Sequence, residues 1–304
     1  SVKWLPQTPN RLSRFRHLPA MVFFAAVIVL WHLFAFTGFF GYDDLQYAEV
    51  AARMMQGAAD WNDHFSFRWT ITGATALAYK LLGINDTASS LPAMLVALAT
   101  LVLITLPLRR YSLSTVAAAL GLFSLNFWSL FYSDKLMPDI YVAFFVTGAI
   151  LVYYHNYRNP MTSGILFALA LMGAFLSKET VVLVLPLLGW WLIRDLRRGG
   201  RGRFWVTTAI TGLLLLGGYL LAVALLTGDP ASRMTALLGN RYVSFCDYSN
   251  QPLRQLLVRI SYGWVADLTR QGMMAGVILT LPALWLLRIR KKKETGSTPG
   301  HASQ

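Results

Sequence analysis

Hydrophobic residues along this chain of 304 residues gather in long runs that are separated by short polar segments. Runs of roughly 17–23 apolar residues match the thickness of the bilayer hydrocarbon and are typical of membrane-spanning helices. The pattern therefore predicts an all-α fold, a polytopic transmembrane bundle of about eight spans. The predicted spans are residues 17–40, 89–108, 113–131, 139–154, 162–176, 180–193, 204–226 and 272–287.

The polar segment after the first span, residues 41–87, contains two further helical patterns. Within residues 41–60 polar side chains recur every three or four positions on one side of a helix, and Leu, Ala and Met group on another. Such an amphipathic helix lies along the bilayer surface, and Gly57 offers it a natural end. The stretch 69–82 is short for a span and contains Gly73, so we expect it in or re-entering the outer interface.

The distribution of basic residues predicts the orientation of the spans. Of 27 Lys and Arg residues, 17 cluster at alternate span ends, as the positive-inside rule expects of cytoplasmic segments. These residues are Lys3, Arg11, Arg14, Arg16, Arg109, Arg110, Arg158, Arg194, Arg197, Arg198, Arg201, Arg203, Arg288, Arg290, Lys291, Lys292 and Lys293. We therefore expect an integral protein of a bacterial-type inner membrane, with both termini cytoplasmic and the segments 41–87 and 227–270 outside. Residues 1–287 would form one transmembrane domain, followed by a basic, disordered cytoplasmic tail at 288–304.

Composition narrows the choice of function. Charged residues make up 13% of the chain, about half the fraction of a soluble domain. The net charge of +13 follows the membrane topology, so nucleic acid is not an expected partner. The lone Cys246 excludes an internal disulfide and a cysteine-based metal cluster. The only metal-like cluster is DWNDH at 60–64, which we interpret as a solvated loop because such short clusters are common by chance.

Polar residues suited to chemistry collect on the predicted outer face. The middle of each predicted span is almost free of charge, whereas a transporter or proton relay would be expected to keep acids there. Nearly all the acids lie instead at the outer boundary, together with several bases. The candidate residues there are Asp43, Asp44, Arg68, Asp139, Lys178 and Glu179.

Most of these residues also have a purely structural interpretation. Asp43 with Gln46 three residues later is close to a capping box, and Asp44 would favour the positive end of the helix dipole. Asp139 follows Pro138 in the manner of an ordinary helix start, and Arg68 between two aromatic residues fits an interfacial belt. Glu179 likewise suits a first helical turn. Lys178 does not, because a cation at a helix N-terminus opposes the dipole and needs an anionic partner or ligand.

Acids and bases set together at a lipid–water boundary suit the transfer of a group from a lipid-linked phosphate. A carboxylate acts as general base on an acceptor hydroxyl, and Arg or Lys binds the phosphate and stabilises it as it leaves. The long lipid tail explains why such a site would lie at a membrane surface.

At these residues the chain resembles the GT-C-type membrane glycosyltransferases, in the branch of the protein mannosyltransferases and the bacterial aminoarabinose transferase. The resemblance covers about the first 200 residues, as the N-terminal module of that family. DDLQYAE at 43–49 is similar to the acidic motif after the first span, and RWTI at 68–71 stands where a loop base contacts lipid phosphate. MPDIYVAFF around Asp139 and SKE at 177–179 are similar to two later motifs.

The resemblance implies an inverting enzyme that uses a polyprenyl-phosphate sugar and no nucleotide. It makes Asp43 the catalytic base, with Asp44 and Asp139 orienting the base or acceptor, or holding a divalent cation. Arg68 and Lys178 would bind the phosphate. Further substrate-binding residues implied at the same site are Gln46, Tyr47, Glu179 and Arg241.

The chain also departs from that family. Gln46 replaces the usual Arg of the first motif. The chain is predicted to have about eight membrane spans, whereas members of that branch have eleven or more. A lipid or glycan acceptor would then be recognised by a partner subunit or by residues 227–270. Within that segment a solvated loop is an equal alternative to a role for Arg241.

Two other functions remain open from the sequence. A non-catalytic polyprenyl-phosphate transporter or flippase would use the same phosphate-binding face but would not need a base at Asp43. A structural subunit of a glycan-assembly complex would tolerate substitution of all the candidate residues on the predicted outer face.

Overall fold

In the computed structural model, all described secondary structure is helical, as predicted. The described residues are 16–39, 41–109, 111–155, 159–239, 252–258 and 261. The chain divides into two compact units, residues 1–241 and 242–304, and of the second unit only α13 (Leu253–Val258) is a described helix. The predicted span 272–287, the tail 288–304 and Arg241 lie outside the described residues, so the single domain predicted over 1–287 stays a prediction.

Four described helices are long and apolar enough to cross a membrane: α1 (Leu18–Ala35), α4 (Asp86–Leu108), α8 (Pro160–Ser177) and α10 (Gly202–Thr227). The pair α5 (Leu113–Ser124) and α6 (Phe127–Ser133) passes the same test together but is bent by 63°. The described part of the chain therefore offers four candidate spans, or five with the bent pair, and the prediction of about eight is wrong.

Local chemistry explains two of the differences. The predicted span 113–131 is broken at Asn126, whose side-chain oxygen accepts hydrogen bonds from the backbone N–H groups of Trp128 and Ser129 and so starts a new helix. The predicted span 180–193 is divided into a 3-10 segment, η3 (Glu179–Val184), and α9 (Leu185–Arg198). Pro186 lies in the first turn of α9, where its missing N–H costs nothing, rather than inside a continuous helix.

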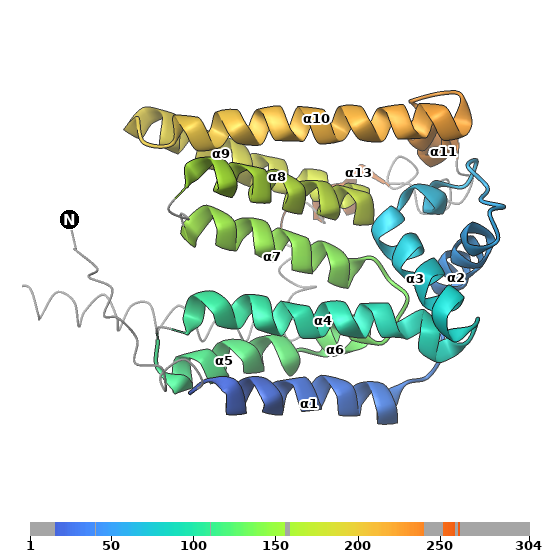
Figure 1. The fold of residues 1–304 in the computed structure, drawn as a ribbon, viewed down its shortest axis with the longest axis horizontal. Coiled ribbons are helices and arrows are strands. Elements are labelled where there is room, and N and C mark those ends of the chain that lie inside the picture. The colour runs from blue at the N-terminus through green and yellow to red at the C-terminus, as the bar shows by residue number, and fades with distance from the viewer. Residues whose placement is uncertain are drawn as a thin grey trace, which may run out of the picture. The chain divides into compact units, whose positions relative to one another are not determined.

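A third predicted span, 139–154, corresponds to α7 (Asp139–His155), which is apolar but shorter than a full span. It lies in the bundle between α4 and α8, packed against both. Figure 1 shows α1, α4, α7, α8 and α10 running side by side, with α1 and α10 on opposite flanks. Only 11% of the apolar windows of α1 and α10 is buried, which fits contact with lipid.

Small residues let α8 approach its neighbours closely. A Cβ atom on Gly164 would lie 2.7 Å from the backbone oxygen of Phe204 in α10. A Cβ atom on Gly173 would lie 2.4 Å from the ring of Phe145 in α7. Glycine at helix contacts is characteristic of tightly packed membrane helices, and here it makes α8 the link between two halves of the bundle.

The short helices α2 (Tyr42–Met55), α3 (Trp69–Leu82) and α11 (Ser232–Gly239) gather at one end of this bundle (Figure 1). The prediction of a helix that ends at Gly57 is confirmed, since Gly57 follows the C-cap of α2 with a φ of 73°. The predicted helix at 69–82 is also confirmed, with the same bounds as α3.

One local interpretation is wrong, and a second holds only in part. The N-cap of α2 is Gly41, without a side-chain cap, so Asp43 and Asp44 lie in the first turn and form no capping box. The segment 60–64, expected to be a solvated loop, is a loop through Asp63, with Asn62 exposed and its neighbours half-buried. Its last residue, His64, begins η2 (His64–Phe67), whose four residues are all buried. Asp63 caps it by accepting a hydrogen bond from the backbone N–H of Phe65.

The amphipathic helix α9 is tied to the bundle by a buried acid, Asp195. Its carboxylate accepts hydrogen bonds from the Tyr153 hydroxyl at 2.9 Å and the Trp205 indole at 3.0 Å. The Tyr153 ring stacks on Trp191 at 4.1 Å between centroids. These contacts hold one face of α9 against α7 and α10 and provide the buried Asp195 with hydrogen-bond donors.

Candidate functional site

Two buried arginines converge on one carboxylate at the end of the bundle where α2, α3 and α11 gather. Arg68 Nη2 lies 3.0 Å from Glu179 Oε2, and Arg233 Nη2 lies 2.8 Å from Glu179 Oε1. The Nε atom of Arg233 also donates to the same oxygen at 3.1 Å. Arg68 and Arg233 are only 8% and 6% exposed. Glu179 therefore bridges two guanidinium groups that are otherwise removed from solvent.

Three separate junctions supply these side chains. Arg68 stands between η2 and α3, Glu179 begins η3 one residue after the end of α8, and Arg233 lies in the first turn of α11. The hydroxyl of Thr70 donates to that of Ser177 at 2.7 Å, which fixes the start of α3 to the end of α8. The arginine–glutamate cluster thus forms where three turns of the chain meet.

Aromatic side chains surround both arginines. The Tyr47 hydroxyl accepts a hydrogen bond from Arg68 Nη1, and the Tyr219 hydroxyl accepts one from Arg233 Nη1 at 3.3 Å. The guanidinium carbon of Arg233 lies 4.1 Å from the ring centroid of Phe175. Because such apolar surroundings screen charge poorly, the hydrogen bonds of this cluster are stronger than equivalent ones in water.

The electrostatics of the cluster keep Glu179 ionised. Burial alone would raise the pKa of the Glu179 carboxyl, but the combined charges of Arg68 and Arg233 outweigh it and hold the pKa below its ordinary value. Burial raises the pKa of the Tyr47 hydroxyl, and the carboxylates of Glu179 and Asp43 add to that rise. Tyr47 therefore stays protonated, and two arginines with one glutamate leave a net charge of +1.

Lys178 finds the anionic partner that its position requires. Its Nζ atom lies 3.0 Å from Asp139 Oδ1 and 3.3 Å from Asp139 Oδ2. These side chains are 28% and 36% exposed, so the pair is much more accessible to solvent than the arginines. Since Lys178 precedes Glu179, the pair forms a second charged centre directly beside the first.

The acids of α2 reach the same end of the bundle. Asp43 is half-buried in the first turn, and its charge acts on the Tyr47 hydroxyl one turn later. Asp44 is fully buried, and Gln46 is half-buried. The structure therefore brings Asp43, through Tyr47, to the arginine–glutamate cluster.

Sequence reasoning missed Arg233 and Tyr219 as members of the cluster. Arg233 carried one usable signal, because a basic residue on the predicted outer face runs against the positive-inside rule and so needs another reason to be there. Tyr219 lies within the apolar helix α10 and carried no signal of its own.

A buried ion pair, Asp134–Lys135, lies close to the end of α1. The charged atoms are 3.4 Å apart, and both side chains are 2% exposed. Lys135 Nζ also donates to the Thr37 hydroxyl at 3.1 Å and the Gly38 carbonyl at 3.2 Å. The pair fastens the segment after α6 to the end of α1 and has a structural role.

The described residues contain no group of three His, Cys, Asp or Glu side chains placed to hold a metal ion. Asp43, Asp44 and Asp139 thus do not form a three-acid metal site. The divalent cation considered from the resemblance has no such donor set in this part of the chain.

Comparison with protein-family models, with curated proteins and with solved structures finds no match. The functional assignment therefore rests on the residues and geometry of this end of the bundle.

Proposed function

We propose that the protein is a membrane glycosyltransferase, which moves a sugar from a polyprenyl-phosphate donor to a lipid, glycan or protein acceptor at the external face of the membrane. The observation that carries this proposal is the convergence of Arg68 and Arg233 on Glu179, next to the acids of α2. The proposal includes a bacterial-type inner membrane with both termini cytoplasmic.

Phosphate binding follows from the arrangement of the cations. Guanidinium groups bind phosphate oxygens through paired, charge-assisted hydrogen bonds, which are strong where solvent is excluded. Arg68 and Arg233 already share one anion, Glu179, and the cluster keeps a net positive charge. Lys178 supplies a third cation whose contact with Asp139 is exposed enough to be exchanged for a ligand.

The acids supply the other half of the reaction. Asp43 takes the proton of the acceptor hydroxyl, and the oxygen of that hydroxyl attacks the anomeric carbon of the sugar. The bond between this carbon and the phosphate oxygen breaks, and polyprenyl phosphate leaves with the bonding electrons. Arg68 and Arg233 stabilise the negative charge that develops on the leaving phosphate. Asp139 orients Lys178, and Asp44 and Gln46 support the first turn of α2 around the base.

The test uses the full chain, purified in lipid nanodiscs, with short-chain polyprenyl-phosphate sugars. We expect Arg233→Gln and Arg68→Gln to weaken binding of the phosphate lipid by tenfold or more, in keeping with the loss of a charged hydrogen bond of about 1.5–3 kcal/mol. Arg197→Gln, at an exposed position in the last turn of α9, is the matched control.

Catalysis is tested separately from binding. Without an acceptor, release of polyprenyl phosphate by slow hydrolysis of the sugar donor can be followed. Asp43→Asn is expected to bind the lipid as the native chain does but to release no polyprenyl phosphate. Release above the protein-free background that is equal in the native chain and Asp43→Asn would contradict the role of Asp43 as the base. Binding of the lipid without release above that background would exclude the enzyme and favour a non-catalytic lipid carrier. If the native chain does not bind the lipid, the phosphate site is excluded, and a structural subunit of an assembly complex becomes the better account.

A further inference from the structure

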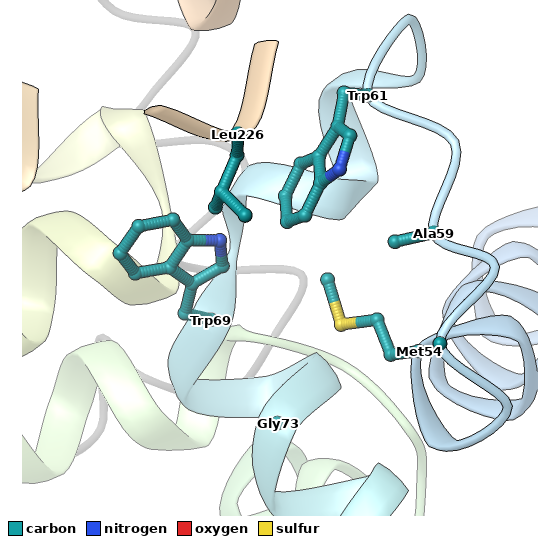
Figure 2. A pocket seen from close by; sticks show the side chains of 7 residues that line it. Met54, Ala59, Trp61, Trp69, Gly73 and Leu226 are labelled. Atoms are coloured by element: carbon teal, nitrogen blue, oxygen red, sulfur yellow. The ribbon is translucent and has the colours of Figure 1, made fainter. Parts of the chain in front are cut away.

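A pocket of about 360 Å³ opens beside the arginine–glutamate cluster. It lies between the end of α2, the start of α3 and the end of α10, and Figure 2 shows the indoles of Trp61 and Trp69 on two sides of it. The lining residues are Met54, Gly57, Ala59, Trp61, Trp69, Gly73 and Leu226.

Two contacts connect this pocket to the cluster. Trp69 directly follows Arg68 in the chain, and its ring packs against that of Tyr219 at 5.0 Å between centroids. The hydroxyl of Tyr219 in turn accepts the hydrogen bond from Arg233. A ligand in the pocket would therefore be separated from the Arg233 guanidinium by two aromatic rings, those of Trp69 and Tyr219.

The lining selects the chemistry of that ligand. In the part of the chain that the structure describes, no charged or hydroxyl side chain lines the pocket, and the polar side-chain groups there are the indole N–H groups of Trp61 and Trp69. Among the described residues, Trp69 Nε1 is buried without a hydrogen-bond partner. A sugar ring would bury several hydroxyls against two donors and no side-chain acceptor, at a cost for each unpaired group. A hydrocarbon chain has no polar groups of its own that burial would leave unpaired.

The position of the pocket also suits a hydrocarbon chain. Leu226 is the second-last residue of α10, so the pocket stands where that candidate span ends. At this depth a lipid places its headgroup against polar residues and its chain against apolar ones. The arginine cluster and the apolar pocket offer these two surfaces side by side.

We propose that this pocket binds one hydrocarbon chain of a lipid. Its assignment to the chain of the phosphate-bearing substrate rests on the proposed function. The hydrocarbon chain of the lipid enters between Trp61 and Trp69, while the phosphate of the same lipid lies at Arg68 and Arg233.

Gly73 allows the pocket to be filled without disturbing the fold. A Cβ atom on this residue would meet no atom within 4 Å, so Gly73→Leu places its side chain in the pocket. Gly212→Leu is the matched control, because Gly212 is also a helical glycine with open space around its Cβ position and lies outside the pocket. Each methylene excluded from the pocket should lower affinity about fourfold, so loss of two gives tenfold or more.

The probes are three photoreactive diazirine compounds: a prenyl phosphate, the corresponding prenol and a linear fatty acid. Labelling of the full chain in nanodiscs is located by mass spectrometry of peptides that contain Met54 or Leu226. We expect the prenyl phosphate and the prenol to label these peptides in the native chain and in Gly212→Leu. In Gly73→Leu the concentration needed for half-maximal labelling should rise tenfold or more.

The outcomes separate the pocket from the phosphate site. Arg233→Gln should weaken labelling by the prenyl phosphate and leave labelling by the prenol unchanged. If Gly73→Leu weakens both probes and Arg233→Gln weakens neither, the hydrocarbon pocket stands and the proposed phosphate site fails. Stronger labelling by the fatty acid than by either prenyl probe overturns the assignment to a prenyl substrate. It would mean that the pocket binds an acyl chain of a bilayer lipid. Labelling of neither peptide, or equal labelling in Gly73→Leu and the native chain, overturns the proposal.

Discussion

Arg233 donates two hydrogen bonds to the Glu179 carboxylate, at 2.8 and 3.1 Å, although 54 residues separate the two in the chain. A third hydrogen bond, from Arg233 Nη2 to the backbone oxygen of Phe175 at 2.8 Å, holds the guanidinium over the end of α8. Through these contacts α11 is fastened to the junction of α8 and η3. Because Arg68 binds the other oxygen of Glu179, one carboxylate forms ion pairs with cations from two distant segments.

Glu179→Gln should therefore destabilise the protein strongly. The change leaves two buried guanidinium groups without their anion, and breaking such a buried pair costs about 3 kcal/mol or more. The measurement is thermal unfolding in detergent, with Glu49→Gln as the control. Glu49 forms an exposed i, i+4 pair with Arg53, which is worth about 0.2–0.5 kcal/mol. Equal shifts for the two variants would show that the Glu179 bridge contributes no more than a surface pair.

The same carboxylate predicts a dependence of stability on pH. The pKa of Glu179 is lower in the folded protein than its ordinary value of 4.5, so its ionised form stabilises the fold. This stabilisation is complete above pH 4.5 and is lost as the pH falls through the lower, folded pKa. Unfolding temperatures of the native chain and Glu179→Gln should accordingly converge below pH 4.5. A constant gap between the two curves from pH 7 down to pH 3 would rule out this coupling.

The Lys178–Asp139 pair should contribute little to stability. Both side chains are partly exposed, and ion pairs of this kind contribute about 0.2–1 kcal/mol. A double-mutant cycle of Lys178→Ala and Asp139→Ala, followed by thermal unfolding, measures the coupling. A coupling well above 1 kcal/mol would make the pair a structural bridge and would remove Lys178 from the set of exchangeable phosphate ligands.

Gly164→Ala should disturb the contact between α8 and α10. The added methyl group would lie 2.7 Å from the backbone oxygen of Phe204, which cannot move without shifting the helix. Overpacking of this kind costs about 1–3 kcal/mol. Gly218→Ala in α10 is the matched control, because nothing lies within 4 Å of its Cβ position and alanine favours a helix. Unchanged stability of Gly164→Ala would mean that the two helices are not closely packed at this point.

The sequence predicted the local elements at the candidate site well. The amphipathic period of residues 41–60 and the stop at Gly57 correspond to α2, and the apolar stretch 69–82 corresponds to α3. Helical periodicity and a glycine end signal depend on neighbours within one or two turns, so they can be read without knowing the fold. The gathering of Arg68, Asp139, Lys178 and Glu179 at one end likewise followed from their places at the boundaries of apolar runs.

Hydropathy did not decide the number of candidate spans, and tertiary structure alone decided the partners of the charges. Hydropathy does not distinguish a span from an apolar segment broken by the Asn126 cap, or from one held to the bundle through Asp195. It also does not show that Arg233 joins Glu179, because that contact depends on how α8, α10 and α11 pack. A buried charge must be neutralised by whichever opposite charge the packing brings within reach, and sequence distance places no limit on that choice.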